Sequence, residues 1–212
     1  GGCTDTLYQT VTIHPLPPVF AGNDTTICPG FTIPLNASGA VTYQWETGTN
    51  NGSNYAPQQS EMLTVIGTDG NGCINSDSLY VTLYPAAVVD AGPDISVCFG
   101  STVTITGSGV VNYSWDNGLV DGQPFTPPVG VVTYTVTGTD GNGCIDSDNM
   151  LLTVWANPVV NAGVDQSICE GDSTLVNGSG ASTYVWNNGI SNNDYFTPLS
   201  NNTYTVVGTD NN

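Results

Sequence analysis

Apolar and polar residues alternate in short runs along the whole chain. The segment Thr133–Asp140, TYTVTGTD, has a period of two residues. Similar runs rich in Val, Ile, Thr and Tyr recur about every 8–12 residues, separated by Gly, Pro, Asn and Asp. No apolar stripe with the 3.6-residue period of a helix is present. The pattern therefore predicts an all-β chain made of many short strands.

One motif sets the period of the sequence. GTDGNGC occupies Gly67–Cys73 and recurs at Gly138–Cys144, and its first residues return at Gly208. Cys73 and Cys144 are 71 residues apart, and Cys3 precedes Cys73 by 70 residues. A fixed period of this length is typical of an array of small domains.

A tryptophan recurs in the third predicted strand of each repeat. The aligned segments YQWETG, YSWDNG and YVWNNG contain Trp45, Trp115 and Trp186. This is the place of the central tryptophan in an immunoglobulin-type (Ig-like) core. We therefore predict that these side chains are core residues, and that the chain forms three tandem Ig-like β-sandwich repeats of about 70 residues in a linear array.

The two ends of the sequence look like two parts of one further repeat. Cys3–His14 resembles a last strand without its domain, and the third repeat has no segment of this kind. Two arrangements remain open: a longer chain that joins the parts covalently, or strand addition between copies of the chain, head to tail. The predicted ranges are 1–18 for the last strand (G) of a preceding repeat, 19–86 for the first repeat, 87–157 for the second, and 158–212 for the third without its last strand.

The charge composition excludes several functions. The chain has no Lys or Arg and 18 acidic residues, for a net charge of −18. Without cations to neutralise phosphates, nucleic-acid binding is not expected. No apolar run approaches the ~20 residues of a membrane helix, so membrane insertion is not expected either. His14 is the only histidine, and no constellation of catalytic side chains is visible, so the sequence predicts that the protein is not an enzyme.

Six cysteines recur at two places in the repeat, which indicates disulfides and an oxidising compartment. Pairing within a repeat would join Cys28 to Cys73 and Cys98 to Cys144. In an Ig-like topology, however, these two places lie at opposite ends of a strand of roughly 26 Å, whereas a disulfide needs Cα atoms within about 7 Å. We favour pairing between neighbouring repeats, and the intradomain pairs remain the alternative. The favoured pairs are Cys28 with Cys144, Cys98 with Cys3 of a neighbouring copy, and Cys169 with Cys73 of that copy.

Recurrent aspartates are the candidate metal ligands. Asp24, Asp94 and Asp165 occupy the same place near the start of each repeat. Together with the net charge, this recurrence motivates a calcium hypothesis at these positions. No other cofactor is predicted.

Short motifs supply candidate glycosylation sites. Asp followed by Ser or Thr and then an apolar residue or Thr resembles the O-glycosylation motif that Bacteroidota use on exported proteins. The resemblance implies that the acceptors are Thr6, Thr25, Ser78 and Ser173. The chain also contains Asn-x-Ser/Thr sequons, one of them at Asn51.

The repeat as a whole resembles a known class of domain. The motifs AGxD, ICxG, YxWxNG and TYTVxGTDGNGC, with the closing strand, resemble the PKD-like and Ig-like tandem repeats of giant Bacteroidota surface adhesins. These include gliding-motility adhesins exported by type IX secretion. The resemblance implies a β-sandwich fold, location at the cell surface, and a role as adhesin stalk or filament.

The functional prediction is an extracellular structural protein, a fibre or adhesin stalk built from head-to-tail Ig-like domains. The alternative is a cell-surface adhesion module that recognises a glycan or protein ligand through its variable loops. The fibre hypothesis expects contacts at recurrent positions, whereas the binding hypothesis expects a ligand at loops that differ between repeats. These loops are Asn50–Asn54, Asp116–Gln123 and Asn187–Asp194.

Overall fold

The fold is all-β, as the alternating pattern predicts. The computed structural model describes residues 1–211, so Asn212, the last residue of the predicted third repeat, lies outside the described residues. Within residues 1–211 the chain forms strands β1 to β16 and two short 3-10 turns, with no α-helix. In this range no helix has the length and apolar character needed to cross a membrane.

The chain divides into two compact units, so the predicted number of three domains stays a prediction. We keep the terms first, second and third repeat for the sequence ranges defined above. One unit holds the first repeat with two short pieces of the second, and the other holds the remainder of the chain. The first unit comprises residues 1–88, 109–112 and 138–146.

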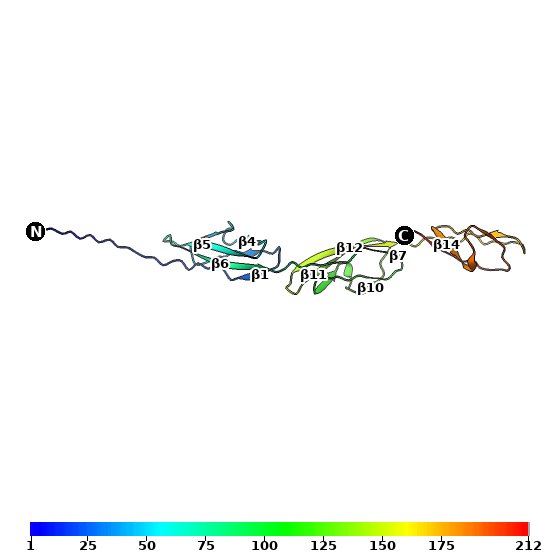
Figure 1. The fold of residues 1–212 in the computed structure, drawn as a ribbon, viewed down its shortest axis with the longest axis horizontal. Helices are drawn as coiled ribbons and strands as arrows, with labels where there is room; N and C mark the ends of the chain where they lie inside the picture. The colour runs from blue at the N-terminus through cyan, green and yellow to red at the C-terminus, as the bar shows by residue number, and fades with distance from the viewer. Residues whose placement is uncertain (212) are drawn as a thin grey trace. The chain divides into compact units, whose positions relative to one another are not determined.

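The first repeat is a sandwich of two small sheets. One sheet has the order β1-β6-β5-β3, and the other pairs β2 with β4. Strands β5 and β6 are the longest of this repeat and lie side by side in antiparallel register, with Val65 opposite Asp77 (Figure 1). The strands are β1 (Thr25–Ile27), β2 (Ile33–Pro34), β3 (Thr42–Trp45), β4 (Asn54–Tyr55), β5 (Glu61–Thr68) and β6 (Ile74–Leu83).

The first segment of the repeat contacts both sheets. Phe20 forms an isolated antiparallel bridge with Ser38, which follows β2 in the chain. Strand β1 then pairs in parallel with the end of β6, with Ile27 opposite Leu83. The last strand β6 therefore lies between β1 and β5 and pairs with both.

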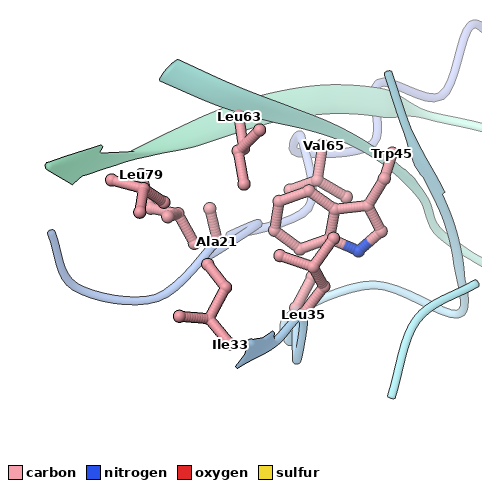
Figure 2. Packing of buried hydrophobic residues seen from close by; sticks show 9 residues of the cluster. Ala21, Ile33, Leu35, Trp45, Leu63, Val65 and Leu79 are labelled. Carbon is pink, nitrogen blue, oxygen red and sulfur yellow. The ribbon is translucent and has the colours of Figure 1, made fainter. Parts of the chain in front are cut away.

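The core lies between the two sheets of the first repeat. Trp45 is 2% exposed and packs with buried side chains of both sheets, as Figure 2 shows for Leu35 and Val65. Alternate residues of β5 and β6 point inward, so Leu79 and Val81 are buried while Tyr80 is exposed. This is the period of two that the sequence shows.

A glycine of the repeated GTD motif is required by this packing. A Cβ atom on Gly67 would lie 2.5 Å from Val19 Cγ2 and 2.8 Å from the Cβ of Ala40. The equivalent Gly208 has equivalent neighbours, Val160 and Ala181. The glycine of the motif that defines the sequence period thus lies where other segments of the same repeat pack closely against β5 or its equivalent.

The second repeat has the same sheet order. Its larger sheet is β7-β12-β11-β9, its smaller sheet pairs β10 with β8, and Asp90 bridges to Ser108. Strand β12 again pairs in parallel with the first strand, Leu152 opposite Ile95. The elements are β7 (Ile95–Cys98), β8 (Val103–Thr104), β9 (Asn112–Trp115), η1 (Asp116–Gly118), β10 (Pro124–Phe125), β11 (Gly130–Thr139) and β12 (Ile145–Trp155).

The third repeat has only part of this arrangement. Strand β13 pairs with β15 and β14 pairs with β16, and Asn161 bridges to Ser179. Among residues 1–211, no strand occupies the places that β6 and β12 fill in the other repeats. The elements are β13 (Thr174–Leu175), β14 (Thr183–Trp186), η2 (Asn187–Gly189), β15 (Tyr195–Phe196) and β16 (Val206–Thr209).

Each core tryptophan has a polar partner in the loop that follows it. The indole N–H of Trp115 donates to Asp121 Oδ1 at 2.8 Å, and the same oxygen accepts from the backbone N–H of Gly107 at 2.7 Å. Trp115 is 5% exposed, so its N–H is satisfied inside the protein. Asn51 and Asn192 take the place of Asp121 in the other repeats, beside Trp45 and Trp186.

We predict that Asp121→Ala destabilises the second repeat by about 2–4 kcal/mol, because it leaves the two donors on Trp115 and Gly107 without an acceptor. Urea unfolding at neutral pH, followed by tryptophan fluorescence, measures this change. The control Gln123→Ala removes an exposed side chain of the same loop and should change stability by less than about 0.5 kcal/mol. Equal effects of the two substitutions would contradict the role of Asp121.

Candidate functional site

A disulfide joins the first repeat to the second. Cys28 follows β1 and Cys144 directly precedes β12; their Cα atoms are 5.4 Å apart and the residues are separated by 116 positions. Cys144 is 1% exposed. This is the pair that the sequence favours. The intradomain alternatives, Cys28 with Cys73 and Cys98 with Cys144, are wrong, because each needs a cysteine that this disulfide uses.

The strand register explains why pairing within a repeat fails. Ile27 is opposite Leu83, and the Tyr84 N–H donates to the Ile27 carbonyl at 2.9 Å, so Cys28 lies near the end of β6. Cys73 precedes the first residue of the same strand. Ten residues of extended chain separate these places by roughly 33 Å, far more than a disulfide spans.

Four cysteines have no disulfide within residues 1–211. Cys73 is partly buried, and Cys3, Cys98 and Cys169 are exposed. The pairs expected with a neighbouring copy, Cys98 with Cys3 and Cys169 with Cys73, stay predictions.

The repeated DGNG turn holds Cys144 in place. Asp140 Oδ1 accepts the backbone N–H groups of Asn142 at 2.8 Å and of Cys144 at 2.9 Å. The bond from the Cys144 N–H is the main cause that lowers the pKa of Asp140 below its ordinary value. Asp69 makes the same bonds before Cys73, which likewise lowers its pKa. The turn presents both cysteines at the start of a last strand.

The recurrent aspartates bind backbone N–H groups of the last strand. Asp24 Oδ1 accepts from the Tyr80 N–H at 2.7 Å, and Asp94 Oδ1 accepts from the Leu151 N–H at 2.7 Å. Asp165, the third member of the set, has no last strand beside it within residues 1–211. In the described part of the chain, no three His, Cys, Asp or Glu side chains form a group able to hold a metal ion. The structure thus assigns Asp24 and Asp94 to hydrogen bonds and does not bring the proposed calcium ligands together.

A second carboxylate, which lies on the last strand itself, accepts a backbone N–H from the first segment of the repeat. Asp148 on β12 accepts the Ala91 N–H at 2.9 Å, and Asp77 on β6 accepts the Ala21 N–H at 2.8 Å. The bond from Ala91 is the main cause that lowers the pKa of Asp148. Neither residue is among the sites predicted from the sequence. The signal that marks them is a recurring Ser-Asp pair, whose Asp lies four residues after the turn cysteine in both complete repeats.

Within residues 1–211, the third repeat has an open groove at the place that the last strand fills in the other two repeats. The groove has a volume of about 620 Å³ and includes the core tryptophan Trp186 and the recurrent Asp165. Ala162 is exposed there, whereas its equivalents Ala21 and Ala91 are 1% and 2% exposed. The other apolar lining residues are Val164, Ile168, Val176, Phe196, Pro198 and Tyr204.

The first sixteen residues form an exposed segment without a strand partner (Figure 1). Its apolar side chains lie in solvent: Leu7 is 92%, Val11 76% and Ile13 89% exposed.

The other candidate sites lie on separate parts of the chain. The proposed glycosylation residues Thr6, Ser78 and Ser173 are exposed, and Thr25 is partly buried on β1. Asn51, the first residue of a sequon, donates a hydrogen bond from its Nδ2 to the Ala37 carbonyl at 3.1 Å. Nδ2 is also the atom to which an N-linked glycan would be attached. The loops proposed for ligand binding contain the acceptors of the core tryptophans, Asn51, Asp121 and Asn192.

The lowered pKa of Asp148 predicts a pH-dependent contribution to stability. A carboxyl group with a lowered folded-state pKa stabilises the fold above its usual pKa of about 3.9, and this contribution is lost as the pH falls through the folded-state value. Asp148→Ala should therefore be less stable than the parent chain at pH 7, and the difference should vanish at a strongly acidic pH where Asp148 is protonated in the folded state too. Urea unfolding at the two pH values checks this, with exposed Glu170→Ala as a control for the loss of one charge. A difference that persists at low pH would contradict it.

Comparison with known proteins gives only distant structural likenesses. No protein-family model matches the chain, and no curated protein does. The chain is similar to the titin I-band fragment I67–I69 at 11% identity and a TM-score of 0.33, covering 91% of this chain and 88% of that one. It is similar to the eight N-terminal Ig domains of Down syndrome cell adhesion molecule at 14% identity and a TM-score of 0.32, covering 81% of this chain and 29% of that one. It is also similar to cadherin domains 1–4 of protocadherin gamma B7, at 14% identity and a TM-score of 0.29, covering 89% of this chain and 66% of that one. The chain thus spans less than a third of the eight-domain fragment of the cell adhesion molecule and about two thirds of the four-domain protocadherin fragment.

Proposed function

We propose that the protein is an extracellular structural protein, the fibre or adhesin stalk that its repeats resemble, and that it carries tension along its chain. The observation that carries this proposal is the Cys28–Cys144 disulfide between consecutive repeats. A disulfide within one repeat would protect only that repeat. A disulfide between consecutive repeats lets tension pass through its two sulfur atoms, so the chain between the two cysteines bears no load.

The strand arrangement supports the same role. The first and last strands of each complete repeat are parallel, β1 with β6 and β7 with β12. Parallel first and last strands place the entry and exit of the chain at opposite ends of the shared ladder. Once the disulfide is reduced, tension on the chain therefore shears several hydrogen bonds of these ladders together instead of breaking them one after another.

The cysteine chemistry and the charge support an extracellular location. Disulfides form and persist in oxidising compartments, and this chain buries one of its two bonded cysteines almost completely. The net charge of −18 keeps copies soluble and leaves no lysine or arginine for trypsin-like proteases to cleave. Both properties suit a protein exposed outside the cell.

Single-molecule stretching of the chain between its ends tests the load-bearing role. With the disulfide intact, the residues between Cys28 and Cys144 should not extend. Reduction should release a further length of roughly 400 Å, from 116 residues at about 3.4 Å each. The double variant Cys28→Ser, Cys144→Ser should show the longer length without reductant. Equal lengths for the oxidised and reduced parent chains would overturn the proposal.

A further inference from the structure

We propose that a hollow in the first repeat binds one neutral sugar residue of a glycan. The hollow has a volume of about 220 Å³ and lies between the first segment of the repeat and strand β2. It is separate from the loops named above for ligand binding, and a sugar site there goes beyond the structural role proposed for the chain. Its origin, its apolar floor, its polar rim and its lack of charge support the proposal.

The hollow exists because the first segment of the repeat changes sheets. Phe20 pairs with Ser38, which follows β2, whereas Thr25 is already opposite Val81 in the larger sheet. Between these two points the segment leaves the side of β2, and a space opens that neither strand fills. The last strand β6 is in place here, so the hollow is a feature of a complete repeat.

The floor of the hollow is apolar and belongs to the core. Ala21, Ile33 and Leu79 line it, and all three are buried. Figure 2 shows them at the end of the core cluster away from Trp45. Gly22 keeps the space above Leu79 open, because a Cβ atom there would lie 3.5 Å from Leu79 Cδ2. An apolar floor of this kind can contact the C–H face of a sugar ring.

The rim of the hollow carries three polar side chains without a partner. They are Asn23, Thr25 and Asn36, and both asparagines are exposed. Within residues 1–211, no hydrogen bond joins these three side chains to another part of the chain. An asparagine amide and a threonine hydroxyl both donate and accept hydrogen bonds, as sugar hydroxyls do. Their hydrogen-bonding capacity is therefore available to a ligand with several hydroxyl groups.

Among the described residues that line the hollow, none is charged, although the chain has 18 acidic residues. The neighbouring carboxylates are bound elsewhere, Asp24 to the Tyr80 N–H and Asp77 to the Ala21 N–H. An anionic ligand would find no Lys or Arg, and a metal ion would find no carboxylate in the lining. The ligand is therefore neutral. A sugar fits better than an apolar side chain of a peptide, which would leave the three polar groups unpaired.

The second repeat has other side chains at the rim positions. Pro93 and Thr106 stand where the first repeat has Asn23 and Asn36. The second repeat has the same sheet order, so the fold accepts these residues. Exchanging the two asparagines for them removes the amide groups and leaves the strands as they are.

An NMR titration of the isotope-labelled, full 212-residue chain tests the proposal. The probes are the methyl glycosides of glucose, galactose, mannose and N-acetylglucosamine, each added at millimolar concentration. At least one of them should shift the backbone amides of residues 21–25 and of Asn36 and leave those of the second repeat unchanged. For a ligand of this size we expect a dissociation constant on the order of 1–10 mM.

Variants show whether the rim makes the contacts. The double variant Asn23→Pro, Asn36→Thr should bind at least about tenfold more weakly, because it lacks both amide groups. The control Asn149→Ala removes an exposed asparagine of the second repeat and should bind as the parent chain does. Urea unfolding checks that the double variant is folded. Asn36→Ala alone, which leaves the first segment unchanged, should weaken binding severalfold and decides the question if the proline alters folding.

Several results would overturn the proposal. They are the absence of shifts at these amides with every probe, shifts confined to other parts of the chain, and equal binding by the parent chain and the rim variants. Shifts of the same amides with increasing protein concentration, in the absence of sugar, would show that a second copy occupies the hollow, which would overturn it too. The stretching measurement tests the load-bearing role separately, so the two proposals can fail independently.

Discussion

The last strand of a repeat is the element on which its other parts depend. In the first repeat, β6 completes the ladder of β5, gives β1 its parallel partner, and covers the core with Leu79 and Val81. Its Asp77 holds Ala21, and Asp24 holds its Tyr80 N–H. Within residues 1–211 the third repeat has no such strand, and there its first segment has no ladder and its core is open.

The absence of lysine and arginine changes how these contacts are made. No carboxylate can pair with a cationic side chain of those two types, so the aspartates bind backbone N–H groups instead. Such bonds are charge-assisted, and they fix the position of one strand against another more narrowly than a pair of long side chains does. The acidic composition therefore has a structural use beyond solubility.

Much of the fold can be predicted from local sequence. The period of two fixes which side chains of β5 and β6 are buried, and the spacing of the turn motif already separates the cysteines of one repeat by a full strand length. The roles of Asp24 and Asp121 cannot be obtained this way, because their partners Tyr80 and Gly107 are 56 and 14 residues away in the sequence. Recurrence alone marked Asp24 as special and suggested calcium, whereas the structure assigns it a hydrogen bond.

The Cys28–Cys144 disulfide also affects how the chain tolerates a break in its backbone. It closes a ring that includes 115 intervening residues, from 29 to 143. A single cut of the backbone anywhere inside this ring leaves both halves of the chain attached through sulfur. Proteolytic nicks or oxidative breaks in the exposed turns of either repeat would then weaken one sandwich without parting the molecule, so the chain is tolerant of single faults over more than half of its length.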